Sequence, residues 1–548
     1  MDSPRRTIIL SASCLFLLTD SLFPQNQNLG EIHGNFETTA QYYNADSLIG
    51  AKAVPEKMLM NGYANINYTY GKNFSAGIRY ESYLNALQGY PAYKGTGIPY
   101  RYATYKNDEL EITAGNYYEQ FGSGLILRAY EERGLGYDNV FDGMRLKYKP
   151  CRGIVLKGIV GKQRVFFEEG AGIVRGLDGE IELNELFSKW VDSKTRINIG
   201  GSFVSKYQPD QDPFYVFPLN VGASSGRLNL IRGDFSLGGE YVYKINDPST
   251  INGNIYKPGE GLLLTSSYSK KGFGINLSAK RVDNMSFRSD RSATGNSLII
   301  NYIPAMSKQH TYSLLNFYPY ASQPNGEITF QAELTYKIPK GTKLGGAYGT
   351  EILVNYSGSN GLDKIYLHDD TAGRKGYTSD FFKVGKDIYF RDFVVEINKK
   401  FSKKLKGTLE YANQIYNKDV IQGLEGYGTI YSDIVVADVT YKIKTDRAIR
   451  AEFQNLSTKQ DKQSWGQGLI EYTHGEHWFC AVLDQYNYGN DIVSQRLHYM
   501  NASVGYIKDA TRITLGYGKQ RAGIFCVGGV CRTVPASNGI TLLVTSSF

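Results

Sequence analysis

Apolar and polar residues alternate along most of the chain, and residues 327–338 show the pattern most clearly. Every second residue of this segment is apolar; the apolar set is Ile328, Phe330, Ala332, Leu334, Tyr336 and Ile338. Side chains of a β-strand point alternately to its two faces, so the pattern predicts a strand with one apolar and one polar face. A tilted strand needs roughly 9–11 residues to cross hydrocarbon, whereas strands of soluble proteins more often have about 5–6. The length of this segment therefore favours a membrane-spanning strand.

The same alternation recurs in residues 32–42, 74–80, 405–411 and 513–517, and the chain also ends on it. One face of the last strand carries Ile540, Leu542, Val544, Ser546 and Phe548. An amphipathic last strand that ends in Phe resembles the C-terminal signal that is read by the assembly machinery of bacterial outer-membrane β-barrels. The resemblance implies the barrel assembly machinery as a partner. An ordinary terminal strand is the alternative.

The connections between the expected strands alternate between short and long. Short links lie near residues 71–72, 106–108, 150–152, 270–271, 339–341, 403–404, 445–446 and 509–510. Longer polar or glycine-rich links lie near residues 44–59, 86–96, 120–140, 207–223, 357–383 and 523–536. Short periplasmic turns and long extracellular loops are typical of outer-membrane barrels. Aromatic residues just before short links predict a girdle at the periplasmic interface; they are Tyr70, Tyr148, Tyr336, Phe401, Tyr441 and Tyr506.

These patterns predict an all-β fold, a large antiparallel transmembrane β-barrel with short periplasmic turns and long extracellular loops. At roughly 20 residues per strand and connection, the length gives about 26 strands, within a range of about 22–26. An open sheet edge in lipid would leave unpaired backbone groups that cost several kcal/mol each, so the sheet must close. We therefore expect the strand that ends at Phe548 to pair with the first strand, near residues 32–42.

The start of the chain predicts export. Arg5 and Arg6 form a basic start, and residues 8–23 are mostly apolar, as in a signal peptide. The predicted organisation is a signal peptide over residues 1–25, followed by a single outer-membrane β-barrel over residues 26–548. The expected location is the outer membrane of a bacterium. The pattern leaves no segment of domain size for an N-terminal plug or a periplasmic domain.

Composition narrows the class of protein. Of the 548 residues, 44 are Tyr and 60 are Gly, and 13% are aromatic, which argues against disorder. After the N-terminus the chain has no run of about eighteen apolar residues, which excludes a helical membrane protein. The formal net charge is +8 without a concentrated basic block, so we expect no nucleic-acid partner.

Residues 115–143 are too charged and irregular for a membrane strand. The residues that we expect to lie in the lumen are Glu119, Gln120, Phe121, Arg128, Tyr130, Glu131, Glu132 and Arg133. In a polar lumen such charges can pair while the apolar groups between them bury locally. We therefore expect this loop to fold inward and narrow the barrel. The alternative is an external loop that is ordered by its own contacts.

The same segment carries the motif YEQFGSGLxLRxYEERxLGxDN, from Tyr118 to Asn139. This motif resembles a family of long outer-membrane β-barrel proteins from Bacteroidota. The resemblance implies a barrel fold and an outer-membrane location. It rests on this one segment and brings no established activity, so it assigns no functional residue.

The chain has five cysteines, and two of them lie close together. Cys526 and Cys531 flank a Val-Gly-Gly-Val tip, and an exported chain meets an oxidising compartment. The spacing therefore predicts a small disulfide at the tip of a hairpin, and two free thiols are the alternative.

Signals for catalysis are weak. Residues 222–226 match G-x-S-x-G in letters, but they lie between a loop and an expected membrane strand and lack the strand–turn–helix context. His368, Asp369 and Asp370 include metal-binding residue types, but a solvated acidic loop is the preferred interpretation. We therefore expect no catalytic residue, no metal and no cofactor.

We interpret the chain as an outer-membrane barrel that serves as a pore or conduit for solutes or polypeptides, narrowed by residues 115–143. A barrel of this size has a wide lumen, and without a constriction it would breach the permeability barrier. The alternative is a non-enzymatic surface anchor or partner-binding barrel in an outer-membrane assembly. The expected partners are outer-membrane lipid, the barrel assembly machinery and another protein of the outer membrane.

Overall fold

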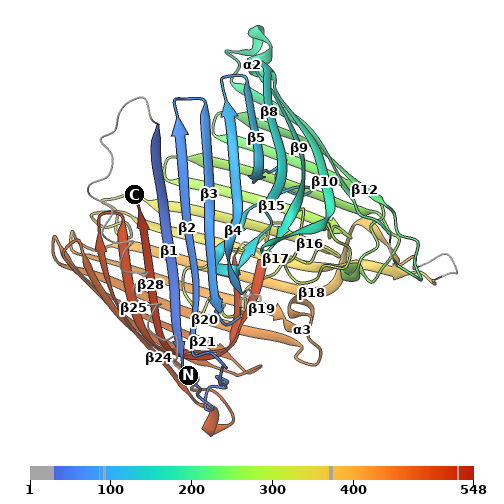
Figure 1. The fold of residues 1–548 in the computed structure, drawn as a ribbon. Coiled ribbons are helices and arrows are strands. Elements are labelled where there is room, and N and C mark those ends of the chain that lie inside the picture. The colour runs from blue at the N-terminus through green and yellow to red at the C-terminus, as the bar shows by residue number, and fades with distance from the viewer. Residues whose placement is uncertain (1–29, 86, 90–93, 211, 370–373, 528–529) are drawn as a thin grey trace.

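The computed structural model describes residues 30–85, 87–89, 94–210, 212–369, 374–527 and 530–548, so the predicted signal peptide lies outside the described residues. One antiparallel sheet of 24 strands closes into a barrel (Figure 1). Its strands are β1 (Glu31–Tyr43), β2 (Met58–Tyr70), β3 (Phe74–Asn85), β4 (Gly95–Lys106), β5 (Leu110–Tyr117), β8 (Phe141–Cys151), β9 (Ile154–Val165), β10 (Glu168–Glu182), β11 (Thr195–Tyr207), β12 (Asn220–Arg232), β13 (Phe235–Lys244), β14 (Gly259–Lys270), β15 (Phe273–Asp283), β16 (Glu327–Ile338), β17 (Thr350–Tyr366), β18 (Tyr377–Lys400), β19 (Leu405–Asn417), β20 (Thr429–Lys444), β21 (Arg447–Thr458), β22 (Trp465–His474), β23 (Trp478–Tyr486), β24 (His498–Lys508), β25 (Thr511–Gln520) and β28 (Ser537–Ser547).

Short elements lie in the connections. Two small hairpins pair β6 (Glu131–Glu132) with β7 (Tyr137–Asp138) and β26 (Gly523–Val527) with β27 (Val530–Val534). The helices are α2 (Leu183–Leu186), α3 (Lys418–Gln422) and the 3-10 turns η2 (Arg133–Leu135), η3 (Ser188–Trp190), η4 (Thr250–Asn252) and η5 (Val493–Gln495). In the part of the chain that the structure describes, no helix is both long and apolar enough to span a membrane.

The first and last strands close the barrel, which confirms the prediction made from the final strand. β1 and β28 pair antiparallel, with Thr38 opposite Val544 in the middle of the ladder. At the end of the chain, the Phe548 N–H donates to the Gly34 carbonyl at 3.0 Å. A Cβ on Gly34 would lie 2.7 Å from a carbon of the Phe548 ring, so the glycine makes room for the terminal aromatic.

The alternating pattern places apolar residues outside and polar residues inside. In β16, Phe330 and Tyr336 are 45% and 44% exposed on the outer surface, whereas Thr329 is 1% exposed and faces inward. A polar interior and an apolar outer surface are the reverse of a soluble barrel and are typical of a barrel in lipid.

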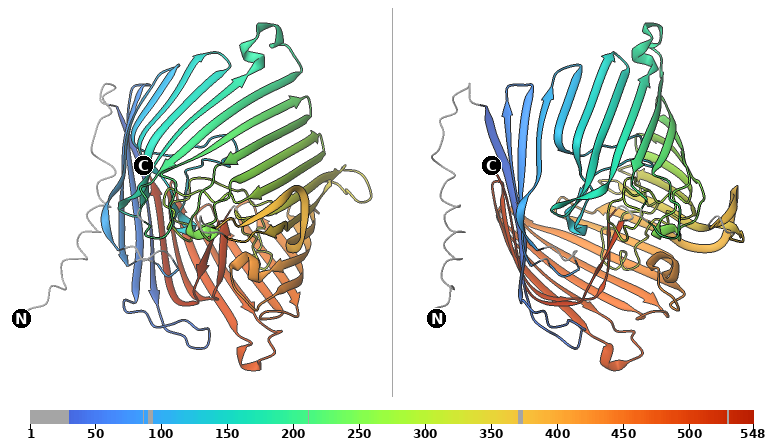
Figure 2. Two further views of the ribbon diagram at one scale, coloured as in Figure 1. Left: turned by 90° about the vertical axis from the view of Figure 1, so that its right-hand side faces the viewer. Right: turned by 45° about the vertical axis from the view of Figure 1, so that its right-hand side comes forward.

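The two edges of the barrel differ as the sequence predicts, with some corrections. The edge of short connections, here called the turn edge, has links as short as Thr445–Asp446, and the opposite loop edge carries most of the long ones. The prediction of a loop at residues 357–383 is wrong, because most of these residues extend β17 and β18 into a projecting hairpin (Figure 2). Five of the six predicted girdle residues are exposed near the turn edge: Tyr70, Tyr148, Tyr336, Phe401 and Tyr441.

The barrel has 24 strands, within the predicted range but below the estimate of about 26. Two stretches of chain enter the lumen instead of forming wall. One is the predicted loop, between β5 and β8. The other is residues 284–326, between β15 and β16, which the alternation pattern did not single out. This second stretch is an internal connection of the barrel chain, and the sequence did not predict that it enters the lumen.

Candidate functional site

Two segments cross the space enclosed by the barrel, and together they are called the plug (Figure 2). The inner loop is residues 118–140, and the inner segment is residues 284–326. They bond to each other through their backbones. The Arg128 N–H donates to the Ile300 carbonyl, and the Tyr302 N–H donates to the Gly124 carbonyl, each at 2.9 Å. Because the two segments are joined in this way, they form one unit across the lumen.

The first half of the plug is the inner loop together with the inner segment as far as Met306, and the second half is the rest of the inner segment. The first half has an apolar core against one side of the barrel. Phe121 and Leu125 of the inner loop and Phe287 of the inner segment are almost completely buried. They pack against valines that point inward from the loop-edge half of the wall. The wall residues in this cluster include Val174, Val204, Val221, Val242 and Val282. The inner wall is therefore apolar at this contact, although most of the lumen is polar.

The second half of the plug packs against the opposite side of the barrel. Leu314, Leu315 and Phe317 of the inner segment are buried against residues of β18 to β24. Wall residues in this cluster include Val394, Ala412, Ile434, Leu456 and Trp465. The plug thus packs against both sides of the barrel and spans the lumen from one side to the other.

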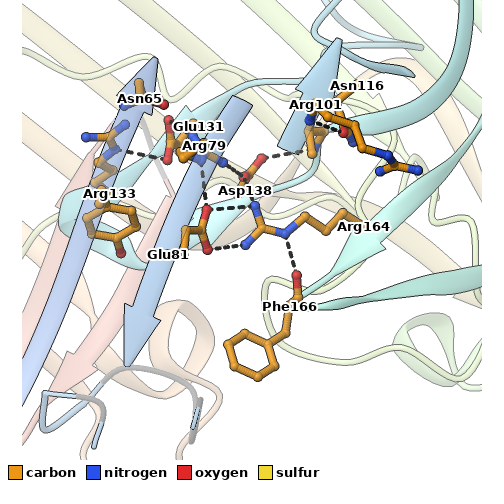
Figure 3. A network of polar contacts seen from close by, with 12 residues as sticks. Asn65, Arg79, Glu81, Arg101, Asn116, Glu131, Arg133, Asp138, Arg164 and Phe166 are labelled. Atoms are coloured by element: carbon orange, nitrogen blue, oxygen red, sulfur yellow. Dashed lines mark hydrogen bonds and ion pairs between the residues drawn. The ribbon is translucent and has the colours of Figure 1, made fainter. Parts of the chain in front are cut away.

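An arginine–carboxylate network holds the inner loop to the wall (Figure 3). Arg79 of β3 pairs with Glu131 at 2.9 Å and with Asp138 at 2.7 Å, both from the inner loop. Arg164 of β9 pairs with the same Asp138 at 3.0 Å and with Glu81 of β3. The arginine side chains are at most 7% exposed. Buried charges of this kind are tolerated only when they are paired and hydrogen-bonded.

A second set of contacts holds the start of the inner loop. Glu119 pairs with Arg145 at 2.5 Å and with Lys157 at 3.0 Å. Burial opposes ionisation of Glu119, but the charges of Lys157 and Arg145 outweigh it and lower the pKa of this carboxyl. Glu240 of β13 accepts hydrogen bonds from the N–H and the hydroxyl of Ser123, at 2.8 and 2.6 Å.

The second half of the plug is held by a lysine and a histidine. Lys308 pairs with Glu410 of β19 at 2.9 Å and also with Glu396 of β18. The His310 Nε2 lies 2.9 Å from a carboxylate oxygen of Asp392. Burial disfavours the charged imidazole, but hydrogen bonds and charges of Asp392 and Glu410 outweigh it and raise the pKa of His310 to about 9. His310 is therefore a charged anchor at neutral pH.

Below the plug, toward the turn edge, the lumen opens into a hollow of about 520 Å³. Its lining is largely basic and includes Lys337, Lys400, Lys406, Asp438 and Arg450. Lys400 and Lys406 lie opposite each other in the β18–β19 ladder, where like charges repel. The Tyr312 hydroxyl of the plug donates to Asp438 at 3.2 Å, so the hollow reaches the plug. We call it the basic vestibule.

The eight loop residues named from the sequence lie in or beside the plug. Phe121 is in its apolar core, Glu119 and Glu131 are in the ion-pair networks, and Arg133 pairs with Glu37 of β1 at 3.1 Å. The Gln120 side chain donates a hydrogen bond to the Gly122 carbonyl, and the Glu132 carboxylate accepts one from the Gly134 N–H. Arg128 stacks on the rings of Tyr130 and Tyr302. Sequence reasoning missed the inner segment. A detectable signal was the 43 residues between two clear strands that lack alternation.

The remaining sequence candidates are placed elsewhere. Cys526 and Cys531 lie opposite each other in the β26–β27 ladder, and their side chains fall outside the described part of the molecule. Ile540, Leu542 and Phe548 are exposed on the outer surface, and Val544 of the same strand face is partly buried.

The structure also locates the residues of the weak catalytic and metal-binding motifs. Residues 222–226 lie within the barrel strand β12, without a helix after them. Of the acidic loop, His368 and Asp369 are described and Asp370 is not. Over the described residues, no group of three or more His, Cys, Asp or Glu side chains is placed to hold a metal ion.

Comparisons with known proteins bear on family and fold. The family model described as "Family of unknown function (DUF6029)" matches residues 5–548. No curated protein is significantly similar in sequence. Among solved structures, the translocation pore of the P pilus usher PapC matches with a TM-score of 0.43 and 10% identity, covering 94% of this chain and 99% of the usher chain. The siderophore receptor PirA from Pseudomonas aeruginosa matches with a TM-score of 0.43 and 10% identity, over 95% and 80% of the two chains. The outer membrane protein opdK from the same organism matches with a TM-score of 0.34 and 12% identity, over 81% and 98%.

Proposed function

We propose that this chain, which belongs to the DUF6029 family of unknown function, is a gated conduit of the bacterial outer membrane, closed in the present structure by its plug. In this proposal the apolar outer surface lies in outer-membrane lipid. The turn edge faces the periplasm and the loop edge faces outward. The exposed final strand, with Phe548 at its end, is the segment that the barrel assembly machinery reads.

The observation that carries the proposal is the way in which the plug is held. Its contacts with the wall include ion pairs at both halves, made by Arg79, Glu119 and Lys308 among others. A buried ion pair is weak evidence for stability, because well-packed apolar residues often do as well or better. Charged contacts, however, can be exchanged for water when two surfaces separate. The second half of the plug, which Lys308 and His310 hold to the wall, is therefore suited to detach.

The basic vestibule supports a conduit and indicates the charge of its cargo. It lies between the turn edge and the plug, and Lys400 and Lys406 face each other in it. A concave surface with an excess of one sign of charge concentrates counter-ions. We therefore infer that the conduit handles anionic solutes, or polypeptides with acidic segments, on the periplasmic side of the plug.

The test is single-channel conductance of the purified, folded protein in a planar bilayer. Three forms are compared: the full chain, a chain with residues 286–322 replaced by a short Gly-Ser linker, and a chain with residues 120–138 replaced in the same way. We expect the full chain to be mostly silent and the first replacement to give large steps. Silence from all three forms, with β-structure confirmed by circular dichroism, would contradict the conduit.

A second candidate function has an observation of its own. The loop edge exposes Phe214, Val216 and Phe382, at 89%, 84% and 88%. Large apolar side chains exposed outside the lipid band are typical of a surface that contacts another protein. The barrel would then anchor these loops in an assembly, and the plug would only seal it. Pull-down with the full chain, lost on replacing these three residues by Ser while the conductance stays silent, would favour this alternative.

A further inference from the structure

The wall of the barrel has a seam between β4 and β5. Their ladder runs only from the pair Tyr102–Gly115 to the pair Lys106–Glu111, which is the shortest ladder between neighbouring strands of the described barrel. Toward the loop edge, β4 continues to Gly95 and pairs with β3 alone. Backbone groups without partners are costly in lipid, at several kcal/mol each. A seam at this place therefore needs specific features that sustain it.

The sequence supplies these features. Gly115 has a φ of +95°, and a Cβ there would lie 2.4 Å from the Arg101 carbonyl oxygen, so only glycine lets β5 bend away from β4. The Arg101 N–H donates to the side chain of Asn116 at 2.8 Å, which replaces a ladder bond (Figure 3). Further along β4, Pro99 has no N–H to satisfy.

A charged residue marks the seam on the outer surface. Arg101 lies five residues before Lys106, the last residue of β4 at the turn edge. This spacing is roughly 16 Å along a strand, which places Arg101 within the expected hydrocarbon band. Its side chain is 59% exposed and pairs with Asp142 at 2.8 Å. An arginine on the lipid face near mid-depth costs about 2–4 kcal/mol. An ionisable residue in this position is a sign of function.

An apolar hollow of about 500 Å³ adjoins Arg101 on the outer surface. Its floor is made of small side chains, from Ala76, Ala103 and Ala114, and its sides include Ile66. Arg101 is the one charged residue of its lining. The volume is typical of a site for a small ligand, and an apolar hollow lined by one charged residue fits an amphiphile.

We propose that the seam is a lateral portal between membrane and lumen for a single-chain amphiphile with an anionic head, such as a long-chain fatty acid. The chain lies in the hollow, and the carboxylate accepts hydrogen bonds from the Arg101 guanidinium, which has five donors and gives one bond to Asp142. This proposal stands apart from axial conduction and does not rest on it.

The inner side of the seam leads to the plug. Tyr118, at the start of the inner loop, stacks on Tyr100 of β4, with ring centres 5.9 Å apart. Its hydroxyl donates to Asp138 in the arginine network at 3.1 Å. A ligand that passes between β4 and β5 therefore meets Tyr118 first, and displacement of this ring would open the portal to the lumen.

The binding site is tested by native mass spectrometry of the full chain in detergent, titrated with palmitate and with hexadecanol. Ala103→Phe fills the hollow and should weaken binding of both probes. Arg101→Gln should weaken palmitate about tenfold, the equivalent of one charge-assisted hydrogen bond, and leave hexadecanol unchanged. Ala451→Phe, on the outward face of β21, is the matched control. Palmitate binding that survives both substitutions, or stronger binding of two-chain phosphatidylglycerol at the same site, would overturn the proposal.

Passage through the seam is tested with a photoreactive diazirine analogue of palmitate. In a background with the four cysteines after residue 14 changed to Ser, Arg101→Cys and Asn116→Cys allow the seam to be locked by a disulfide. The same variant in its reduced form is the unlocked reference, so that the loss of the Arg101 guanidinium is common to both forms. We expect the probe to label the inner-loop peptide that contains Tyr118, and to lose this label when the seam is locked. A disulfide between Val439→Cys and Ala451→Cys, paired across β20 and β21, is the control and should not affect labelling. Labelling confined to the outer hollow in the unlocked protein would rule out a portal.

Discussion

The two halves of the plug are held to the wall by different chemistry. The inner loop is held by Arg79 and Arg164, whose guanidinium groups stay charged at every accessible pH. The second half is held by Lys308 and His310, and an imidazole changes charge within a moderate pH range. The inner loop is therefore a permanent anchor, whereas the second half is the part of the plug that can be released.

The largest effect is expected from removing an arginine of the permanent anchor, which tests whether the inner loop is held more firmly than the second half. Arg79→Met leaves Glu131 and Asp138 without one of their partners in a buried site. Removing one member of a buried ion pair typically costs about 3–5 kcal/mol. We expect a large fall in the urea midpoint of the folded barrel in lipid vesicles, followed by intrinsic tyrosine fluorescence. Arg196→Met is the control, because its side chain is 69% exposed. An unchanged midpoint for Arg79→Met would show that the network is not an anchor.

A smaller effect is expected from the releasable half. Asp392→Asn removes the charge that faces His310 but keeps a group of similar shape. A hydrogen bond to a charged group contributes about 1.5–3 kcal/mol and a neutral one about 0.5–1.5 kcal/mol, so the plug should detach in part while the barrel stays folded. The expected result is intermittent conductance steps with a nearly unchanged urea midpoint. The comparison fails if this substitution unfolds the barrel as readily as Arg79→Met does.

The pH dependence sharpens the same contrast. The pKa of His310 is raised to about 9 in the folded protein, from an unfolded value near 6.5. A raised pKa of a base contributes stability that is fully present below pH about 6.5 and is lost as the pH rises through about 9. The carboxylates of Asp392 and Glu410 contact the His310 ring. Lys308 lies beside them and pairs with the same Glu410.

The measurement is the open fraction in a planar bilayer between pH 6 and pH 10. We expect it to rise over the upper part of this range in the full chain. His310→Gln should give an open fraction that is higher at pH 6 and nearly flat with pH. An equally steep rise in His310→Gln would assign the pH response to another group.

The contrast also explains what could be predicted from the sequence. Alternation identifies β16, and the final apolar strand predicts the closing pair, because both depend on a local period of two residues. The inner loop is recognisable because its charges cannot lie in a membrane strand. The inner segment has no such period. Its conformation depends on wall residues far away in the chain, such as Gln454, which accepts a hydrogen bond from the Leu314 N–H at 2.8 Å.

The seam was missed for a related reason. In the sequence, neither Gly115 nor Pro99 indicates that two strands separate. An alternating segment predicts a strand that pairs with its neighbour along its whole length. Only the register shows that β4 and β5 separate at Tyr102. A sequence contains the residues that permit such an opening, but the position of the partner strand decides whether they form one.

The smallest expected effect concerns the contact between the inner loop and the inner segment. Arg128 stacks on Tyr130 and Tyr302, with its guanidinium carbon 4.6 and 4.1 Å from the ring centres. Its backbone N–H still donates to Ile300 when the side chain is changed, so Arg128→Gln removes the cation–π contacts, about 0.5–2 kcal/mol, and a side-chain hydrogen bond to Tyr302. Tyr302→Phe separates the two contributions, because it keeps the ring and removes the hydrogen bond.

If the inner loop anchors the plug as a whole, loosening this contact should raise the open fraction near pH 9, where His310 loses its charge, and should hardly change it at pH 6. Equal effects at both pH values would mean that the two halves of the plug move independently. The inner loop would then restrain only itself, and release of the second half alone would be enough to open the lumen.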